Sequence, residues 1–129
     1  MASPRHLDWG KCDWFYPNPS TTRKCYQGSE NFTITMGLVQ PNIVPGPHKH
    51  YYEQTVVILQ GKCDFYVGEG DNVEKFTFDA KLEDGGICFM TIPPNEVHWI
   101  ENPYDKPVYN MDIFAPKRTE DREESKEVR

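Results

Sequence analysis

The sequence lacks any long hydrophobic stretch. No run of apolar residues approaches the ~20 that a membrane-spanning helix requires. The first residues, from Met1 to Trp9, also lack the apolar stretch of a secretory signal peptide. We therefore expect a cytoplasmic protein with no membrane partner.

Positive charge is also scarce. The 129 residues include 14 lysines and arginines against 20 aspartates and glutamates, which gives a formal net charge of −6. A nucleic-acid-binding protein needs a basic face to neutralise phosphates. The charge balance therefore argues against a nucleic-acid partner.

Cysteine is sparse and irregularly spaced. The cysteines form neither a Cys-x-x-Cys pair nor the dense framework of a small disulfide-stabilised domain. We expect free thiols at all of them, namely Cys12, Cys25, Cys63 and Cys88.

Proline and glycine, by contrast, are frequent, with 11 prolines and nine glycines. Such frequent breaks favour short strands joined by turns over a helical bundle. Alternating apolar and polar residues predict strands over residues 31–39 and 62–67 and around Phe76 and Phe78. Apolar runs predict strands over 54–60 and 87–92, and we also expect strands over 98–101 and 108–114. The pair Gly61-Lys62 predicts a tight turn between two of them. Strands at intervals of about 8 to 12 residues are typical of an all-β sandwich or barrel.

The chain divides into three segments around one predicted domain. Residues 1–28 form an irregular segment with several large aromatic side chains, which we expect to cover a barrel wall or a neighbouring subunit, with a substrate lid as the alternative. Residues 29–116 form the predicted barrel. Residues 117–129 are almost entirely charged and have no apolar face to bury, so we expect a frayed tail or a solvated helix.

The histidines give the strongest functional signal. His48 and His50 are one residue apart, so on an extended segment they point to the same face, roughly 7 Å apart. Neutral imidazole is the commonest metal ligand in proteins. A third histidine, His98, follows much later in the chain, whereas His6 lies in the irregular terminus, where we expect it to be exposed.

The spacing of these residues resembles the cupin superfamily. Its first motif reads Gly, five residues, His-x-His, three or four residues, Glu, six residues, Gly. The matching residues here are His48, His50, Gln54 and Gly61. Gln54 stands in place of the glutamate, and Asn42 in place of the first glycine. Its second motif includes Pro-x-Gly, two residues, His, three residues, Asn. The match is Pro93, His98 and Asn102, with Asn95 in the glycine position. Asparagine tolerates the left-handed conformation that this turn requires.

The resemblance implies a single-domain, all-β cupin fold, also described as a double-stranded β-helix or jelly-roll barrel. It also implies a metal site on His48, His50, Gln54 and His98. An amide oxygen coordinates a divalent cation more weakly than a carboxylate does. Glu53 is the alternative ligand if a turn at Tyr51-Tyr52 breaks the alternation. The ligand set suits one divalent transition metal, namely Fe, Mn, Ni, Co or Zn.

A neutral ligand set leaves the whole +2 charge on the ion, which strengthens it as a Lewis acid. It also removes a carboxylate base from the metal, so a base must come from elsewhere. The candidates by proximity to the motifs are Tyr52, Tyr66, Tyr109 and Asp112.

Cupins with similar His-His-Gln-His sites include enzymes that process unsaturated uronates, hydroxynitrile lyases and an isomerase of dipeptide-antibiotic synthesis. The resemblance therefore implies a lyase or an isomerase or cyclase, acting on a small, enolisable carbonyl or hydroxy-acid substrate. A non-haem Fe(II) dioxygenase and a non-catalytic ligand-binding barrel are the alternatives. The resemblance also implies a homodimer.

Overall fold

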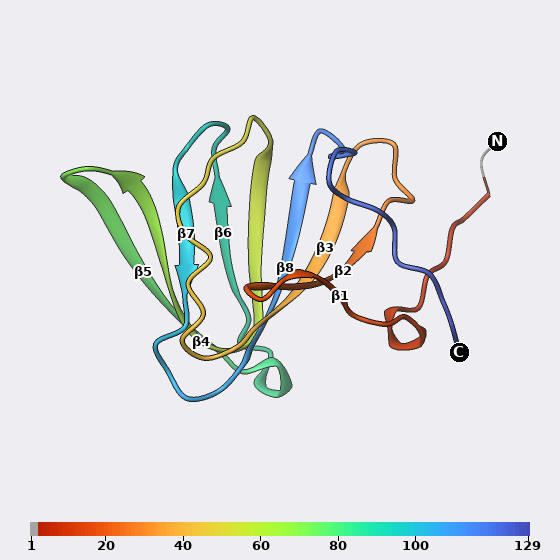
Figure 1. Cartoon of the computed structure of the whole chain (residues 1–129), viewed down its shortest axis with the longest axis horizontal. Helices are drawn as coiled ribbons and strands as arrows, with labels where there is room; N and C mark the ends of the chain where they lie inside the picture. Colours follow the sequence, from red (N-terminus) through yellow and green to blue (C-terminus); the bar gives the residue numbers. More distant parts are fainter. Residues whose placement is uncertain (1–2) are drawn as a thin grey trace.

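The computed structural model describes residues 3–129 and forms a barrel of antiparallel strands (Figure 1). Met1 and Ala2, the first residues of the predicted N-terminal segment, lie outside the described residues. The strands are β1 (Phe15–Asn18), β2 (Thr21–Tyr26), β3 (Thr33–Val39), β4 (Glu53–Glu69), β5 (Asn72–Ala80), β6 (Cys88–Ile92), β7 (His98–Glu101) and β8 (Val108–Ala115). Of the two short 3-10 helices in residues 3–129, η1 (Trp9–Lys11) precedes β1 and η2 (Leu82–Asp84) lies between β5 and β6. None of the helices formed by residues 3–129 has the length and hydropathy to cross a bilayer.

Strand β4 connects the two halves of the barrel. Its first half pairs with β6 and β8, and its second half pairs with β5 and β7. Figure 1 shows the first half lying between β6 and β8. The barrel closes around a core in which Val56, Ile58 and Phe65 of β4 are buried.

The predicted tight turn at Gly61-Lys62 is wrong, because β4 continues through it. Gly61 pairs with Ala80 and Lys62 with Asp79, so hydrogen bonding is not interrupted. Gly61 has φ of +108°, and a Cβ atom there would lie 2.9 Å from the Pro107 carbonyl oxygen. The glycine thus allows the strand to bend from one half of the barrel to the other.

The N-terminal segment is more regular than its sequence predicts. β1 and β2 form a hairpin, and β2 pairs with β3 from Arg23 to Tyr26. Only Cys25 of β2 is fully buried, so the strand has no alternating apolar pattern from which it could be predicted. The segment extends the barrel sheet, with β1 as its outer strand.

The expectation of a frayed or solvated C-terminal tail is also wrong. The Ser125 amide donates to the Cys25 carbonyl oxygen at 3.0 Å, and the Val128 amide donates to that of Lys11 at 2.8 Å. The side chains of Arg118 and Arg122 are only 14% and 12% exposed. The segment docks through backbone hydrogen bonds and arginine packing, neither of which requires an apolar face.

The cysteine prediction is confirmed. All four cysteines are free thiols, and Cys12, Cys25 and Cys63 are buried.

Candidate metal centre

The backbone brings the two histidine motifs together. The His48 amide donates to the His98 carbonyl oxygen at 3.1 Å, and the His98 amide donates to that of His48 at 2.9 Å. The Asn95 amide donates to the His50 carbonyl oxygen at 2.7 Å, which fixes the loop before β7 against the same segment. Asn95 has φ of +65°, as predicted for its turn, and Asn42, which replaces the first-motif glycine, has φ of +66°. Both asparagines therefore supply the backbone conformation for which glycine is otherwise used.

The three imidazoles converge as predicted. The ring of His98 lies 4.4 Å from that of His48 and 5.1 Å from that of His50, measured between centroids. One donor nitrogen from each histidine lies within 4.8 Å of the others. Small ring rotations bring such atoms to the separations that one ion requires.

Backbone contacts set the orientation of two of the rings. Nδ1 of His98 lies 2.8 Å from the Glu96 carbonyl oxygen, and Nδ1 of His48 lies 3.2 Å from that of Gly46. A ring that donates from Nδ1 keeps the lone pair of Nε2 for a metal. Nε2 of His98 is buried and has no hydrogen-bond partner among residues 3–129, as expected for a ligand atom.

The electrostatic environment keeps these rings neutral. Burial lowers the pKa of His98 to about 4 and also lowers the pKa of His48 and His50. His98 is the most buried of the three, at 1% exposed, whereas His48 is the most exposed. Metal binding requires neutral imidazole, so the site is prepared for an ion at neutral pH.

Gln54 completes the set, and its amide has a defined orientation. Its Nε2 group donates to Oδ1 of Asp112 at 3.0 Å, which turns the amide oxygen Oε1 toward His50. This oxygen lies 2.9 Å from Nε2 of His50. That is a hydrogen-bond distance, and it is also close to the ~3 Å that separates adjacent ligands on an ion with bonds of about 2.1 Å. Glu53, the alternative ligand, is exposed at the start of β4, whereas Gln54 is 5% exposed.

The four residues fit a divalent transition metal. They offer three imidazole nitrogens and one amide oxygen, a set that suits Fe, Mn, Ni, Co or Zn. The orphaned nitrogen of His98 and the fixed amide of Gln54 both support a ligand role.

Of the four candidate bases, Asp112 lines the cavity beside the histidines. Its Oδ1 accepts from Gln54, and its Oδ2 accepts from Nδ2 of Asn110 at 3.1 Å. Burial raises the pKa of Asp112 to about 6, although these two hydrogen bonds act in the opposite direction. A carboxyl with this pKa is suited to proton transfer near neutral pH.

Tyr52 lies near the site but is committed to another contact. Its ring centroid is 5.8 Å from that of His50, and its hydroxyl donates to Oε1 of Glu120. Burial and this hydrogen bond hold the pKa of Tyr52 far above its ordinary value, so the hydroxyl stays protonated at neutral pH.

The structure places the other two tyrosines outside the cavity. Tyr66 pairs with Trp99, the neighbour of His98, and stacks on its ring at 5.0 Å, so it lies on the opposite face of the sheet from His98. In β8, Asn110, Asp112 and Phe114 line the cavity, so Tyr109 points outward.

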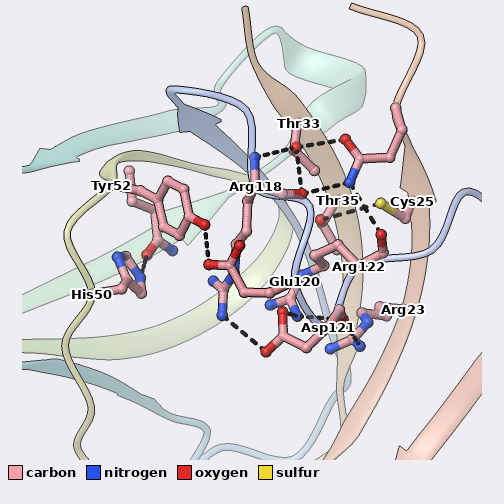
Figure 2. A network of polar contacts seen from close by, with 12 residues as sticks. Arg23, Cys25, Thr33, Thr35, His50, Tyr52, Arg118, Glu120, Asp121 and Arg122 are labelled. Atoms are coloured by element: carbon pink, nitrogen blue, oxygen red, sulfur yellow. Dashed lines mark hydrogen bonds and ion pairs between the residues drawn. The ribbon is translucent and has the colours of Figure 1, made fainter. Parts of the chain in front are cut away.

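Sequence reasoning missed three arginines in the cavity wall. The cavity has a volume of about 200 Å³, and its lining includes Arg23 from β2 and Arg118 and Arg122 from the C-terminal segment. Figure 2 shows the three arginines gathered around Asp121, with His50 and Tyr52 on the far side of Arg118. No local sequence pattern predicts that the charged C-terminal segment packs against the barrel, because Arg23 and the two C-terminal arginines are far apart in the sequence.

Comparison with known proteins identifies the fold family. The family described as "Cupin domain" matches residues 35–114. No curated protein sequence matches the chain significantly.

Solved structures agree on the fold. KdgF from Halomonas sp. superposes with a TM-score of 0.74 at 17% identity, over 92% of this chain and 98% of that one. An RmlC-like cupin from Shewanella frigidimarina gives 0.73 at 14% identity, over 90% and 94% of the two chains. Oxalate decarboxylase from Bacillus subtilis, a protein with Mn(II) centres, gives 0.66 at 18% identity, over 81% of this chain and 28% of that one. These likenesses confirm the all-β jelly-roll barrel, and the family match over residues 35–114 shows that this chain belongs to the cupin family.

Proposed function

We propose that this protein is a metal-dependent cupin enzyme, a lyase or isomerase that acts on a small, enolisable carbonyl or hydroxy-acid substrate. The observation that carries the proposal is the orientation of Gln54. Asp112 holds its amide so that an uncharged oxygen, and not a carboxylate, faces His50 of the metal centre. These four residues would hold a divalent metal without neutralising its charge, and the metal would then supply Lewis-acid polarisation of a substrate oxygen.

The chain's own residues supply the remaining parts of such a reaction. Asp112 holds a proton at Oδ1 or Oδ2 when it is neutral and accepts one when it is ionised, and its pKa of about 6 makes both states accessible. Phe114 and Ile100 contribute apolar surface to the cavity lining. Tyr52 contributes packing and the contact with Glu120, since its hydroxyl is already bonded.

Activity on enolisable acids in the absence of oxygen tests this proposal. Each candidate 2-keto or 2-hydroxy acid is incubated with Mn(II)-, Ni(II)- or Fe(II)-loaded protein in D2O, with proton exchange followed by NMR. A parallel aerobic sample is followed with an oxygen electrode. We expect metal-dependent exchange or elimination without oxygen, and no oxygen uptake in the aerobic sample. Oxygen uptake coupled to turnover would instead favour the dioxygenase.

The non-catalytic barrel makes a different prediction. In that case His48→Ala leaves ligand affinity largely intact, whereas either enzyme loses both metal and activity.

The cytoplasmic location and the homodimer stay predictions. The exposed Phe15 and Tyr16 on β1, at 55% and 66% exposure, support a subunit contact at this outer strand.

A further inference from the structure

The cavity carries more positive charge than its own carboxylates balance. Three guanidinium groups line it, from Arg23, Arg118 and Arg122. Asp112 is the carboxylate in its lining, Asp121 contacts the arginines, and the nearby Glu120 interacts with Arg118 but accepts from the Tyr52 hydroxyl. The Asp121 side chain is 58% exposed, so solvent weakens its pairing with the arginines.

The arginines also retain unused hydrogen-bond donors. Three guanidinium groups have about 15 N–H donors. Within residues 3–129, their hydrogen bonds all go to Asp121: one from Arg23, one from Arg118 and two from Arg122. The Nε groups of Arg118 and Arg122 are buried and have no partner in this described part of the chain. A buried charged donor without an acceptor is costly, so the pair lacks an acceptor that a ligand can supply.

The aromatic side chains fix the position of the charged groups. The Arg118 guanidinium lies 4.8 Å from the Phe114 ring centroid and 5.4 Å from that of Tyr52, and Arg122 lies 5.6 Å from Phe114. Phe114 in turn lies 5.5 Å from the His50 ring. Arg118 and Arg122 therefore share one wall of the cavity with the metal centre, whereas Arg23, which also lines the cavity, stacks on the Phe15 ring at 5.4 Å.

We propose that Arg23, Arg118 and Arg122 form an oxyanion subsite that binds the carboxylate of a small acid whose other oxygen faces the histidines. Carboxylates are the planar anions that arginine binds best, through paired N–H donors. The cavity volume of about 200 Å³ admits a molecule somewhat larger than benzene, which occupies an engineered cavity of about 150 Å³. A carboxylate bound here would define the substrate class of the proposed enzyme. Only the role of the acid's other oxygen at the histidines rests on the proposed function.

The pKa of Arg122 is consistent with an incomplete site. Burial, together with the neighbouring charges of Arg118 and Arg23, lowers it to about 10, although Asp121 and Asp112 act in the opposite direction. A bound carboxylate would offset this repulsion.

Arginine Nε–H signals in NMR spectra test the subsite without any catalytic readout. Acetate is titrated at constant ionic strength into the metal-stripped full chain, with acetamide as the neutral probe of the same shape. We expect acetate to shift the Nε–H signals of Arg118 and Arg122, and acetamide to leave them unchanged. The signal of Arg129, which pairs with Asp13 on the surface, serves as the internal control.

Variants give a second measurement. We expect Arg122→Gln to weaken acetate binding about tenfold, and Arg129→Gln to leave it unchanged. Equal effects of acetate and acetamide, equal shifts at Arg129, or unaltered affinity in both Arg118→Gln and Arg122→Gln would overturn the proposal. Because the protein is stripped of metal, these results are independent of the metal chemistry, and metal content is measured separately.

Discussion

His48 and His98 exchange two backbone hydrogen bonds, and their rings lie 4.4 Å apart although the residues are distant in the sequence. The same pair closes the barrel between the segment before β4 and the start of β7. The metal site therefore forms only when the barrel closes, so metal binding and folding are coupled.

This coupling predicts that metal stabilises the protein. At a free metal concentration of 100 times the dissociation constant, the expected gain in the free energy of unfolding is about 2.7 kcal/mol. Urea unfolding with and without a chelator measures it. A gain of the same size in His98→Ala would show that the metal binds elsewhere.

The role of Asp112 in orienting Gln54 predicts the effect of Gln54→Glu. Two facing carboxylates would replace the hydrogen bond between Gln54 Nε2 and Asp112 Oδ1, so we expect a loss of about 2 kcal/mol in the metal-free protein at pH 7.5. In the double variant Gln54→Glu/Asp112→Asn, the new amide can donate to the introduced carboxylate. We therefore expect the double variant to recover most of the lost stability. Additive losses in this double-mutant cycle would contradict the contact.

The pKa values of His98 and Asp112 predict opposing pH effects in the metal-free protein. As the pH falls from 6.5 toward 4, unfolded His98 takes up a proton and folded His98 does not, so stability decreases. Folded Asp112 takes up its proton near pH 6, whereas the unfolded chain does so near 3.8, so its contribution increases stability as the pH falls through the same range.

Asp112→Asn removes the second contribution alone. Between pH 6.5 and 4, we expect the unfolding free energy of the variant to fall by about 2 kcal/mol more than that of the wild type. This value allows for solvent screening in the water-accessible cavity. Unfolding free energies measured in a chelator across this range provide the comparison. Parallel pH curves for the two proteins would refute the assignment.

The docking of the C-terminal segment predicts the effect of Thr33→Val. The buried Thr33 hydroxyl accepts from the Arg118 amide at 2.8 Å and also lies 2.7 Å from Oε1 of Gln27. Valine leaves these groups unpaired, so we expect a cost of about 2 kcal/mol and faster amide exchange at Ser125 and Val128. Thr55→Val is the matched control, because the Thr55 hydroxyl on β4 pairs with that of Thr91 on β6 at an exposed position. Unchanged exchange at both amides would mean that Thr33 does not hold the segment.

The parts of the fold that were predicted depend on local pattern. The bounds of β7 and the start of β8 at Val108 agree with the predicted strands, and the turn at Asn95 follows from the conformational tolerance of asparagine. Convergence of the three histidines followed from motif spacing and the family resemblance.

The remaining features depend on contacts between distant residues. The bend at Gly61 arises from pairing with both halves of the barrel, and β2 is a strand because β3 offers it an edge. The inward direction of Asp112 and the outward direction of Tyr109 depend on the register of β8, which the sequence left open. The position of Arg118 and Arg122 in the cavity wall could not be predicted, because residues 117–129 have no hydrophobic periodicity that indicates packing on the barrel.

Metal content per chain tests the central claim most directly. Protein stripped with chelator, reloaded with Mn(II) and desalted should retain about one ion per chain by elemental analysis. His48→Ala and His98→Ala should each lose most of it, and the exposed His6→Ala should retain it. Mn(II) that is absent from the wild type, or that survives both substitutions in the His48–His98 pair, would contradict the metal centre.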